Sequence, residues 1–325
     1  MALTKVSNSM LVQPVNHNIL INPSFTVKQR GDVVEHEVGD PLGPDRWKVR
    51  GSDAVGGTKS ESSTEVDAAT GINKLVVKHP RDATDPIKSN AWVYQYIEAV
   101  NIQGLYGKEM TFSFSYSDVG GSGIPKVEVW SFDSSAALKD LYDAVPTSLG
   151  DNRWTCTFNL STNDGTIPDP SERGMYVLIS ANEANNAPDE WRVWETKLEV
   201  GSVVTPFIAR SHGEELALCQ RYYYRIWGDY APVGTGVWKS DTSRLYNTHI
   251  VFPTTMRSVP SVSYSGKVII TDRIVGEHDV DDMDLMGFST GSVQLNTTSV
   301  AGWDDKTILQ MLTRDSGAVM FEAEL

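Results

Sequence analysis

Residues 191–227 read WRVWETKLEVGSVVTPFIARSHGEELALCQRYYYRIW, and this stretch decides how the rest of the chain is divided. It begins as a strand, continues through a short linker and a helix, and ends in an aromatic run that opens a second module. Ser211 and Glu214 have the spacing of a capping box, in which the Ser side chain bonds the N–H three residues on while Glu reaches back. The stretch therefore predicts a junction between two β-rich modules.

The predicted helix of this junction carries an apolar stripe. Leu216, Cys219, Tyr223 and Ile226 are spaced by three, four and three residues, which places them on one helix face if the helix extends that far. A helix of about 12 residues is marginal alone, so the stripe must pack on something. It faces either a three-fold axis, as the neck of a trimer, or the chain's own sandwich.

Charge and composition exclude several classes of partner. The chain has 325 residues and a net charge of -14, which argues against binding to nucleic acid or to an anionic membrane. No window approaches the roughly 18 apolar residues of a membrane helix, and the N-terminus lacks the apolar core of a signal peptide. Cys156 and Cys219 are expected to be buried, reduced thiols of a protein folded in a reducing cytoplasm.

Strand signals recur at short intervals before the junction. Phe112, Phe114 and Tyr116 alternate with polar residues, a period of two that is typical of an antiparallel sheet with one buried face. Residues 32–70 are interpreted as a loop-rich segment with a short strand near Trp47. Many short strands with almost no long helix predict a β-sandwich. The candidate strands are 74–78, 91–100, 110–116, 126–132, 153–160, 174–180 and 191–200.

The same pattern resumes after the junction in a module of about 100 residues. A domain of that size buries a modest fraction of its surface, so oligomerisation would help it. The candidate strands here are 222–227, 236–239, 246–253, 261–265, 268–272, 285–289, 292–298, 307–313 and 318–325.

Residues 1–16 form a segment of another kind. They are small and polar, with isolated apolar side chains at Leu3, Val6, Met10 and Val12. Fully extended, the segment reaches about 50 Å, enough to lie along a partner. The two interpretations are an anchor that binds another protein and a frayed chain end.

Three stretches resemble bacteriophage tail fibre proteins: NILINPSFTVKQRG from residue 18, the junction, and VFPTTMRSVPSVSYSG from residue 251. In that family a jelly roll like that of carbohydrate-binding modules precedes a compact β-rich tip. The opening MALTKVSNSML is similar to segments by which such fibres attach to the virion. The resemblance implies a homotrimeric virion appendage that recognises host-surface glycan, although jelly rolls also serve as spacers.

Motifs of catalysis and metal binding are weak. The six His residues never pair with Cys or Glu at metal-ligand spacing, and no GxSxG, P-loop or GxGxxG-helix motif is present. Residues 278–284 (HDVDDMD) are interpreted as a solvated acidic loop, with a calcium site as the alternative because the loop lacks EF-hand spacing. Family relatives hold calcium near the first strand, but Asn22 to Phe25 lacks the acidic ligand. We therefore expect no cofactor, no metal and no enzyme activity.

Aromatic residues are the remaining candidates for glycan binding, because sugar rings stack on aromatic faces. Trp and Tyr residues inside strand patterns are interpreted as core or sheet packing, namely Trp92, Tyr94, Trp130, Trp154, Trp191 and Trp194. Aromatic residues nearer loops of the second module are the predicted glycan site, with burial at a trimer interface as the alternative. That site comprises Trp227, Tyr230, Trp238, Tyr246 and Trp303, with Asp304 as a hydroxyl acceptor.

The sequence thus predicts an all-β protein: a virion anchor (1–16), a jelly-roll β-sandwich (17–204), a linker and short helical neck (205–221) and a smaller β-sandwich-like tip domain (222–325). The predicted function is a homotrimeric tail fibre of a phage virion, made in the host cytoplasm, which binds other virion proteins at its N-terminus and host polysaccharide elsewhere. The alternatives are a structural appendage without a receptor (head fibre, decoration or baseplate spacer) and, less favoured, a polysaccharide-degrading enzyme. For an enzyme, the separation of two carboxylates is the defining feature, and sequence does not give it.

Overall fold

The computed structural model describes residues 18–31, 33–36, 43–51, 60–78, 91–119, 123–181, 190–272, 276–299, 303 and 308–324. These residues form two compact units that divide at Glu215/Leu216. The predicted anchor residues Leu3, Val6, Met10 and Val12 lie outside the described residues, as does Asp304. No helix in the described ranges is long and apolar enough to cross a membrane.

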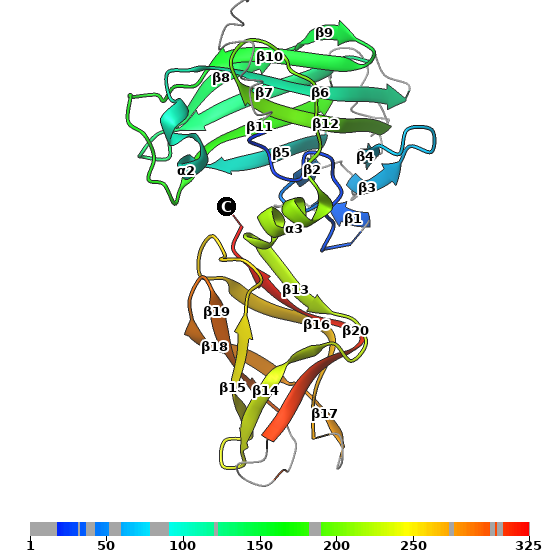
Figure 1. Ribbon diagram of the computed structural model, residues 1–325, viewed down its shortest axis with the longest axis vertical. Coiled ribbons are helices and arrows are strands. Elements are labelled where there is room, and N and C mark those ends of the chain that lie inside the picture. The colour runs from blue at the N-terminus through cyan, green and yellow to red at the C-terminus, as the bar shows by residue number, and fades with distance from the viewer. Residues whose placement is uncertain are drawn as a thin grey trace, which may run out of the picture. The chain divides into compact units, whose positions relative to one another are not determined.

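The first unit, here called the jelly roll, contains two antiparallel sheets (Figure 1). In spatial order, sheet A contains β1 (Val33–His36), β3 (Ser60–Val66), β4 (Asn73–Lys78), β12 (Glu190–Val200), β6 (Glu109–Val119), β10 (Arg153–Asn159) and β9 (Thr147–Gly150). Sheet B contains β2 (Lys48–Gly51), β5 (Ala91–Glu98), β11 (Arg173–Ala181), β7 (Pro125–Phe132) and β8 (Leu138–Ala144). Short helices α2 (Ala99–Ile102) and η1 (Gln103–Leu105) follow β5.

The strand pairing identifies the sandwich as a jelly roll. Among the described strands, β4 pairs with β12 and β6 with β10 in sheet A, while β5 pairs with β11 and β7 with β8 in sheet B. These pairs are nested in the sequence and alternate between the sheets, as in a jelly roll built from two Greek keys. The predicted all-β jelly-roll sandwich is confirmed.

The core of the jelly roll lies between the two sheets. Phe112 and Phe114 of β6 and Val93 and Ile97 of β5 belong to one buried cluster. Because side chains alternate across a strand, Ser113 of β6 and Tyr94 and Tyr96 of β5 point away from the core. The free Cys156 is in the same cluster, and burial raises the pKa of its thiol to about 12, so the thiol is protonated and unreactive at neutral pH.

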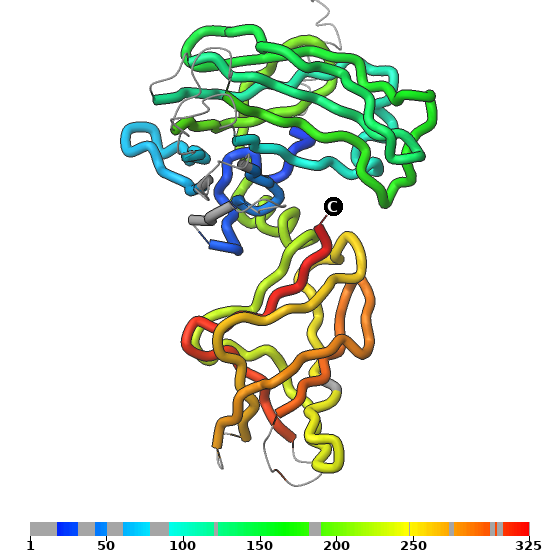
Figure 2. Tube along the Cα trace, turned by 180° about the vertical axis from the view of Figure 1, so that it is seen from behind, coloured from blue at the N-terminus to red at the C-terminus, as the bar shows by residue number. Residues whose placement is uncertain are grey.

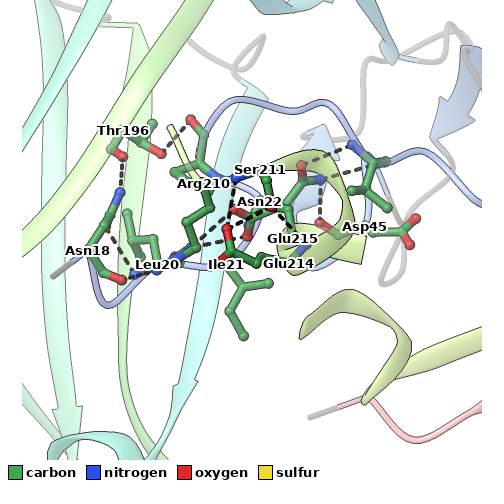
Figure 3. A network of polar contacts seen from close by, with 12 residues as sticks. Asn18, Leu20, Ile21, Asn22, Asp45, Thr196, Arg210, Ser211, Glu214 and Glu215 are labelled. Carbon is green, nitrogen blue, oxygen red and sulfur yellow. Dashed lines mark hydrogen bonds and ion pairs between the residues drawn. The ribbon is translucent and has the colours of Figure 1, made fainter. Parts of the chain in front are cut away.

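A polar clamp joins the first described residues of the jelly roll to its last (Figure 3). Arg210 donates to the carbonyl oxygens of Asn18 and Leu20 and pairs with the Glu215 carboxylate at 3.1 Å. That carboxylate accepts the N–H of Asn22. Asn22 has φ 53°, a left-handed conformation that Asn tolerates, and its amide donates to the carbonyl of Asp45 at 2.9 Å.

The helix α3 (His212–Gln220) begins with the predicted capping box. The N–H of Glu214 donates to Ser211 Oγ at 3.3 Å, and the N–H of Ser211 donates back to Glu214 Oε2 at 3.0 Å. The Ser211 hydroxyl, followed by its backbone N–H, lowers the pKa of Glu214. The predicted motif is confirmed.

The prediction that Leu216, Cys219, Tyr223 and Ile226 form one helical stripe is wrong. The helix ends at Gln220, so Leu216 and Cys219 lie on α3, whereas Tyr223 and Ile226 belong to β13 (Tyr223–Trp227). Aromatic residues favour strands, and β13 gains backbone bonds by pairing with β20 (Ile308–Glu322) along its whole length. Ile226 packs against the core of the second unit.

The second unit, here called the tip unit, contains one antiparallel sheet rather than two separate ones. Its described strands in spatial order are β17 (Glu277–Asp279), β16 (Ser261–Thr271), β20, β14 (Pro232–Lys239), β15 (Arg244–Val251), β19 (Ser292–Thr298) and β18 (Asp282–Phe288), with β13 also paired to β20. The N–H of Val280 bonds the carbonyl of Val268, and the N–H of Asp281 bonds that of Thr298. These bonds link the β16 side of the sheet to β19, so the sheet wraps around its core.

Two predicted pairs of short strands are each one long strand with an irregularity. β16 joins the segments predicted at 261–265 and 268–272, and β20 joins those at 307–313 and 318–325. The register of their pairing shifts between Ser265 and Lys267. Figure 2 shows the red β20 bending partway along its length, where Asp315 and Ser316 have φ 49° and 64°.

The predicted acidic loop at 278–284 lies largely in strands β17 and β18. Asp279 pairs with Lys267 at 3.3 Å, and Asp284 pairs with Arg244 at 3.3 Å. Neighbouring cations therefore neutralise two of its carboxylates. Within the described ranges, no group of three or more His, Cys, Asp or Glu could hold a metal ion.

Candidate functional site

Part of the outer face of sheet A is covered by the chain itself. Residues 201–206, here called the strap, follow β12 and run over this face. Thr111 Oγ1 donates to the carbonyl of Gly201 at 2.5 Å. Lys197 donates to the carbonyl of Pro206 at 3.1 Å and pairs with Glu199 at 3.1 Å. Thr111 and Lys197 are both 0% exposed, so this part of the sheet A face is closed to a ligand.

The outer face of sheet B carries the densest group of aromatic side chains on the described jelly roll. We call this surface the sheet B face. Strand alternation directs these side chains away from the core residues Val93, Val129 and Val177. Its aromatic members are Trp92, Tyr94 and Tyr96 of β5, Tyr176 of β11, and Trp130 and Phe132 of β7.

Strand register places three of these aromatics in one row. Tyr96 lies opposite Tyr176, and Tyr176 lies opposite Trp130. All three side chains are half-buried. Neighbouring strands are about 4.8 Å apart, so Tyr96 and Trp130 are separated by roughly 10 Å across the sheet. The row therefore runs perpendicular to the strands.

Ring contacts fix the aromatic side chains in place. The centroids of Tyr96 and Tyr176 are 5.5 Å apart at 76°, and those of Tyr94 and Tyr96 are 5.5 Å apart at 87°. Phe132 lies 6.1 Å from Tyr176 and is buried. Such edge-to-face pairs stabilise by about 0.5–1.5 kcal/mol each beyond their burial. The surface is therefore preorganised, which lowers the entropic cost of binding.

Carboxylates border the aromatic row on the β7–β8 side. Trp130 Nε1 donates to Glu128 Oε2 at 3.2 Å. Lys126 pairs with Glu128 at 3.0 Å and with Asp143 at 2.8 Å. Burial alone would lower the pKa of Lys126, but hydrogen bonds to Asp143 and Glu128 outweigh it and raise that pKa. Asp140 lies opposite Trp130 and is exposed.

The phenol of Tyr176 is a neutral hydrogen-bond donor on this surface. Burial raises its pKa, and the negative charges of Glu128 and Asp140 and the neighbouring Tyr96 raise it further. Flat rings that contact the C–H face of a sugar, with carboxylates and a phenol that bond its hydroxyls, suit a saccharide. Ligand sites in general are also lined by aromatic and apolar side chains with a small number of polar groups among them.

The predicted site residues of the tip unit do not share one surface. Trp238 is 0% and Trp303 8% exposed, and their rings pack edge-to-face 5.3 Å apart in the core. A ring buried in this way has no face for a sugar. Their assignment to the glycan site is therefore corrected. Tyr246 is half-buried and lies opposite Val237 on β15.

Trp227 and Tyr230 are exposed, at 61% and 44% of their surface. Arg225 stacks on Trp227 at 4.6 Å, and Arg314 stacks on Tyr230 at 5.1 Å. These two aromatics are the accessible members of the predicted set.

The sequence interpretation missed the sheet B face. The strand pattern predicts that Trp92 and Trp130 serve core or sheet packing, whereas both are half-buried on the outer surface. One sequence signal indicates the position of Trp130. Lys126, Glu128 and Trp130 are every second residue of β7, so their side chains point to the same face of the sheet. A tryptophan in step with two charged residues lies on the polar face of a sheet.

No family model and no curated protein matches this chain. Solved structures with a similar fold include the enzymatically active domain of tailspike protein 4 from bacteriophage CBA120 (10% identity, TM-score 0.33, 57% of this chain and 21% of that chain). A second is the C-terminal family 22 carbohydrate-binding module of Clostridium thermocellum Xyn10B (14% identity, TM-score 0.34, 59% of this chain and 99% of that chain). A third is TmCBM61 in complex with β-1,4-galactotriose (12% identity, TM-score 0.31, 57% of this chain and 99% of that chain). This chain thus spans about a fifth of the tailspike domain. Because the TM-scores are below 0.5, the functional conclusion is drawn from the residues of this chain.

Proposed function

We propose that the jelly roll is a non-catalytic glycan-binding module and that the sheet B face is its binding surface. The observation that carries this proposal is the cross-strand row Tyr96–Tyr176–Trp130, bordered by Glu128 and Asp140, on the sheet face opposite the strap. A saccharide lies across the strands, with its rings on the aromatic row and its hydroxyls bonded to the carboxylates. The rings are held in place before the ligand arrives, so little ordering is required on binding.

Replacement of Trp130 tests the surface. Trp130→Ala removes an aromatic anchor, and truncation of such anchors typically costs about 2 kcal/mol or more. We expect roughly 30-fold weaker binding to immobilised host-surface polysaccharide, measured as dissociation constants by biolayer interferometry. Trp227→Ala is the matched control, because Trp227 is the exposed tryptophan of the tip unit.

The outcomes separate the two candidate surfaces. If Trp227→Ala weakens binding and Trp130→Ala does not, the glycan site is the predicted one on the tip unit. If the unmodified protein binds no surface polysaccharide, the chain is a spacer without a receptor. Release of reducing ends from the polysaccharide would contradict the non-catalytic role.

We further propose that the chain is a virion appendage, a homotrimeric tail fibre attached through residues 1–16. The support is the resemblance of residues 1–11, of the junction and of residues 251–266 to tail fibre proteins. Local support at the junction comes from α3, where Leu216 is half-buried and Ala217 exposed, as on a surface that can pack against a second copy.

Light scattering tests the oligomeric state. We expect a solution mass of about three times the 35.8-kDa chain mass, and a loss of that assembly in Leu216→Asp, because a buried unpaired carboxylate at a helix interface is costly. An unmodified protein of single-chain mass would contradict the trimer. A trimer that survives Leu216→Asp would exclude α3 as its interface.

A further inference from the structure

Three basic side chains surround one aromatic residue of the sheet B face. Arg46, which precedes β2, donates to the carbonyl oxygen of Tyr96 at 2.7 Å. Lys48 Nζ lies 5.2 Å from the Tyr96 ring centroid, and Arg173 Cζ lies 4.3 Å from the same centroid. The two cations on the ring are therefore within about 10 Å of each other.

This basic group stands out against the charge of the chain, which is -14. Glu128, Asp140 and Asp143 lie on the other side of the sheet B face, at β7 and β8, where Lys126 and Trp130 bond two of these carboxylates. Glu98 of β5 is 1% exposed and lies opposite Arg173. Arg50 of β2 is exposed and lies opposite Trp92, on the same side as Lys48. The accessible side chains are therefore Arg50 and Arg173 on one side of the face and Glu128, Asp140 and Asp143 on the other.

Arg173 is the side chain best placed to bind an anion. Among the described residues it makes no ion pair with a carboxylate, and the same holds for Arg50. By contrast Arg314, which also stacks on a tyrosine, is paired with Glu277. A guanidinium held on an aromatic face keeps its planar edge available for a carboxylate, to which it can donate two parallel bonds.

We propose, on the basis of the glycan-binding function above, that the saccharide is acidic and that Arg173 binds its carboxylate. The uronic-acid-type unit sits at the β2–β5 side of the face, beside Arg173 and on the side that carries the exposed Arg50. The neutral units extend over Tyr176 and Trp130 toward the acidic side.

The test uses matched pairs of immobilised oligosaccharides. Each pair contains an acidic saccharide (a glucuronate, galacturonate, mannuronate or sialate) and its carboxyl-reduced neutral counterpart, probed with the full-length protein at about 50 and 500 mM NaCl. Binding is expected on acidic members, at least tenfold stronger than on their neutral counterparts, as is typical for a charge-assisted hydrogen-bonded pair. Raising the salt concentration is expected to reduce that preference.

Two variants of Arg173 test whether this residue produces the preference for acidic saccharides. Arg173→Gln is expected to remove the acid preference, so that acidic and neutral members bind alike, and Arg173→Lys is expected to retain part of the preference through its charge. Lys108→Gln is the control, because Lys108 is exposed on the same unit and its replacement changes the net charge equally. Thermal unfolding of each variant confirms that the fold is kept.

The results that would contradict the acidic ligand, the role of Arg173 and the glycan-binding function differ from one another. Equal or stronger binding of neutral members overturns the acidic ligand while the glycan-binding function stands. An acid preference that survives Arg173→Gln, or that Lys108→Gln removes as well, overturns the role of Arg173. Absence of binding to every saccharide overturns the glycan-binding function itself.

Discussion

Replacing Lys197 by alanine is expected to destabilise the jelly roll by about 3–5 kcal/mol, as is usual when one partner of a buried ion pair is removed. Lys197 is 0% exposed, and Glu199, its partner at 3.1 Å, is 7% exposed. The substitution leaves the Glu199 carboxylate buried without its cation. It also removes the donor that holds the strap at Thr205 and Pro206.

Urea unfolding followed by hydrogen exchange in β6 and β12 measures this loss. Lys108→Ala, an exposed lysine of the same unit, is expected to change the free energy of unfolding by less than about 0.5 kcal/mol. The double variant Lys197→Met with Glu199→Leu is expected to recover much of the stability, because it removes both buried charges together. If Lys197→Ala unfolds at the same urea concentration as the unmodified protein, the buried pair contributes nothing.

Gly317→Ala is expected to destabilise the tip unit by about 3 kcal/mol or more, the upper range for overpacking. A Cβ at Gly317 would lie 2.1 Å from the carbonyl oxygen of Lys267 and 2.9 Å from that of Arg314. Both neighbours are backbone atoms of paired strands, so neither can turn aside as a side chain could. Relief requires β16 and β20 to separate at their shared irregularity.

Hydrogen-exchange mass spectrometry resolves this effect within the chain. Peptides of β13, β16 and β20 are expected to exchange faster in Gly317→Ala, whereas jelly-roll peptides keep their rates. Gly291→Ala is the matched control, because the nearest atom to its added Cβ is Ser289 Oγ at 4.0 Å. Unchanged exchange in β16 and β20 would show that the two backbones are not in close contact there.

The strands of the sandwich were largely predictable where one face is apolar and the other polar. Phe112 and Phe114 alternate with Thr111 and Ser113, and β6 forms there. β3 reads SESSTEV, a polar sequence that predicts a loop. It forms a strand because backbone pairing with its neighbours holds it without apolar alternation. Local patterns contain no information on such pairing.

The aromatic surface could not be predicted because apolar residues occupy both faces of β5. Val93 and Ile97 enter the core, while Trp92, Tyr94 and Tyr96 lie outside. Periodicity locates two faces but does not say which one is buried when both are apolar. Tyr96, Tyr176 and Trp130 come together only through the register of β5, β11 and β7, a long-range property of the nested pairing.

The end of α3 illustrates the same limit at short range. Spacing alone permitted a helix as far as Ile226, and the competing strand depends on β20, about 100 residues later in the chain. Long-range backbone pairing thus decided a local conformation.

The clamp at Asn18, Asn22, Arg210 and Glu215 has a mechanical consequence. It brings together the two points at which the chain enters and leaves the jelly roll. A pulling force along the chain therefore loads these bonds, together with the bonds of Asn18 and Ile19 to β12, before it reaches the other strands. β7 and β11, which carry Trp130 and Tyr176 of the proposed binding surface, are not among the strands that these bonds engage.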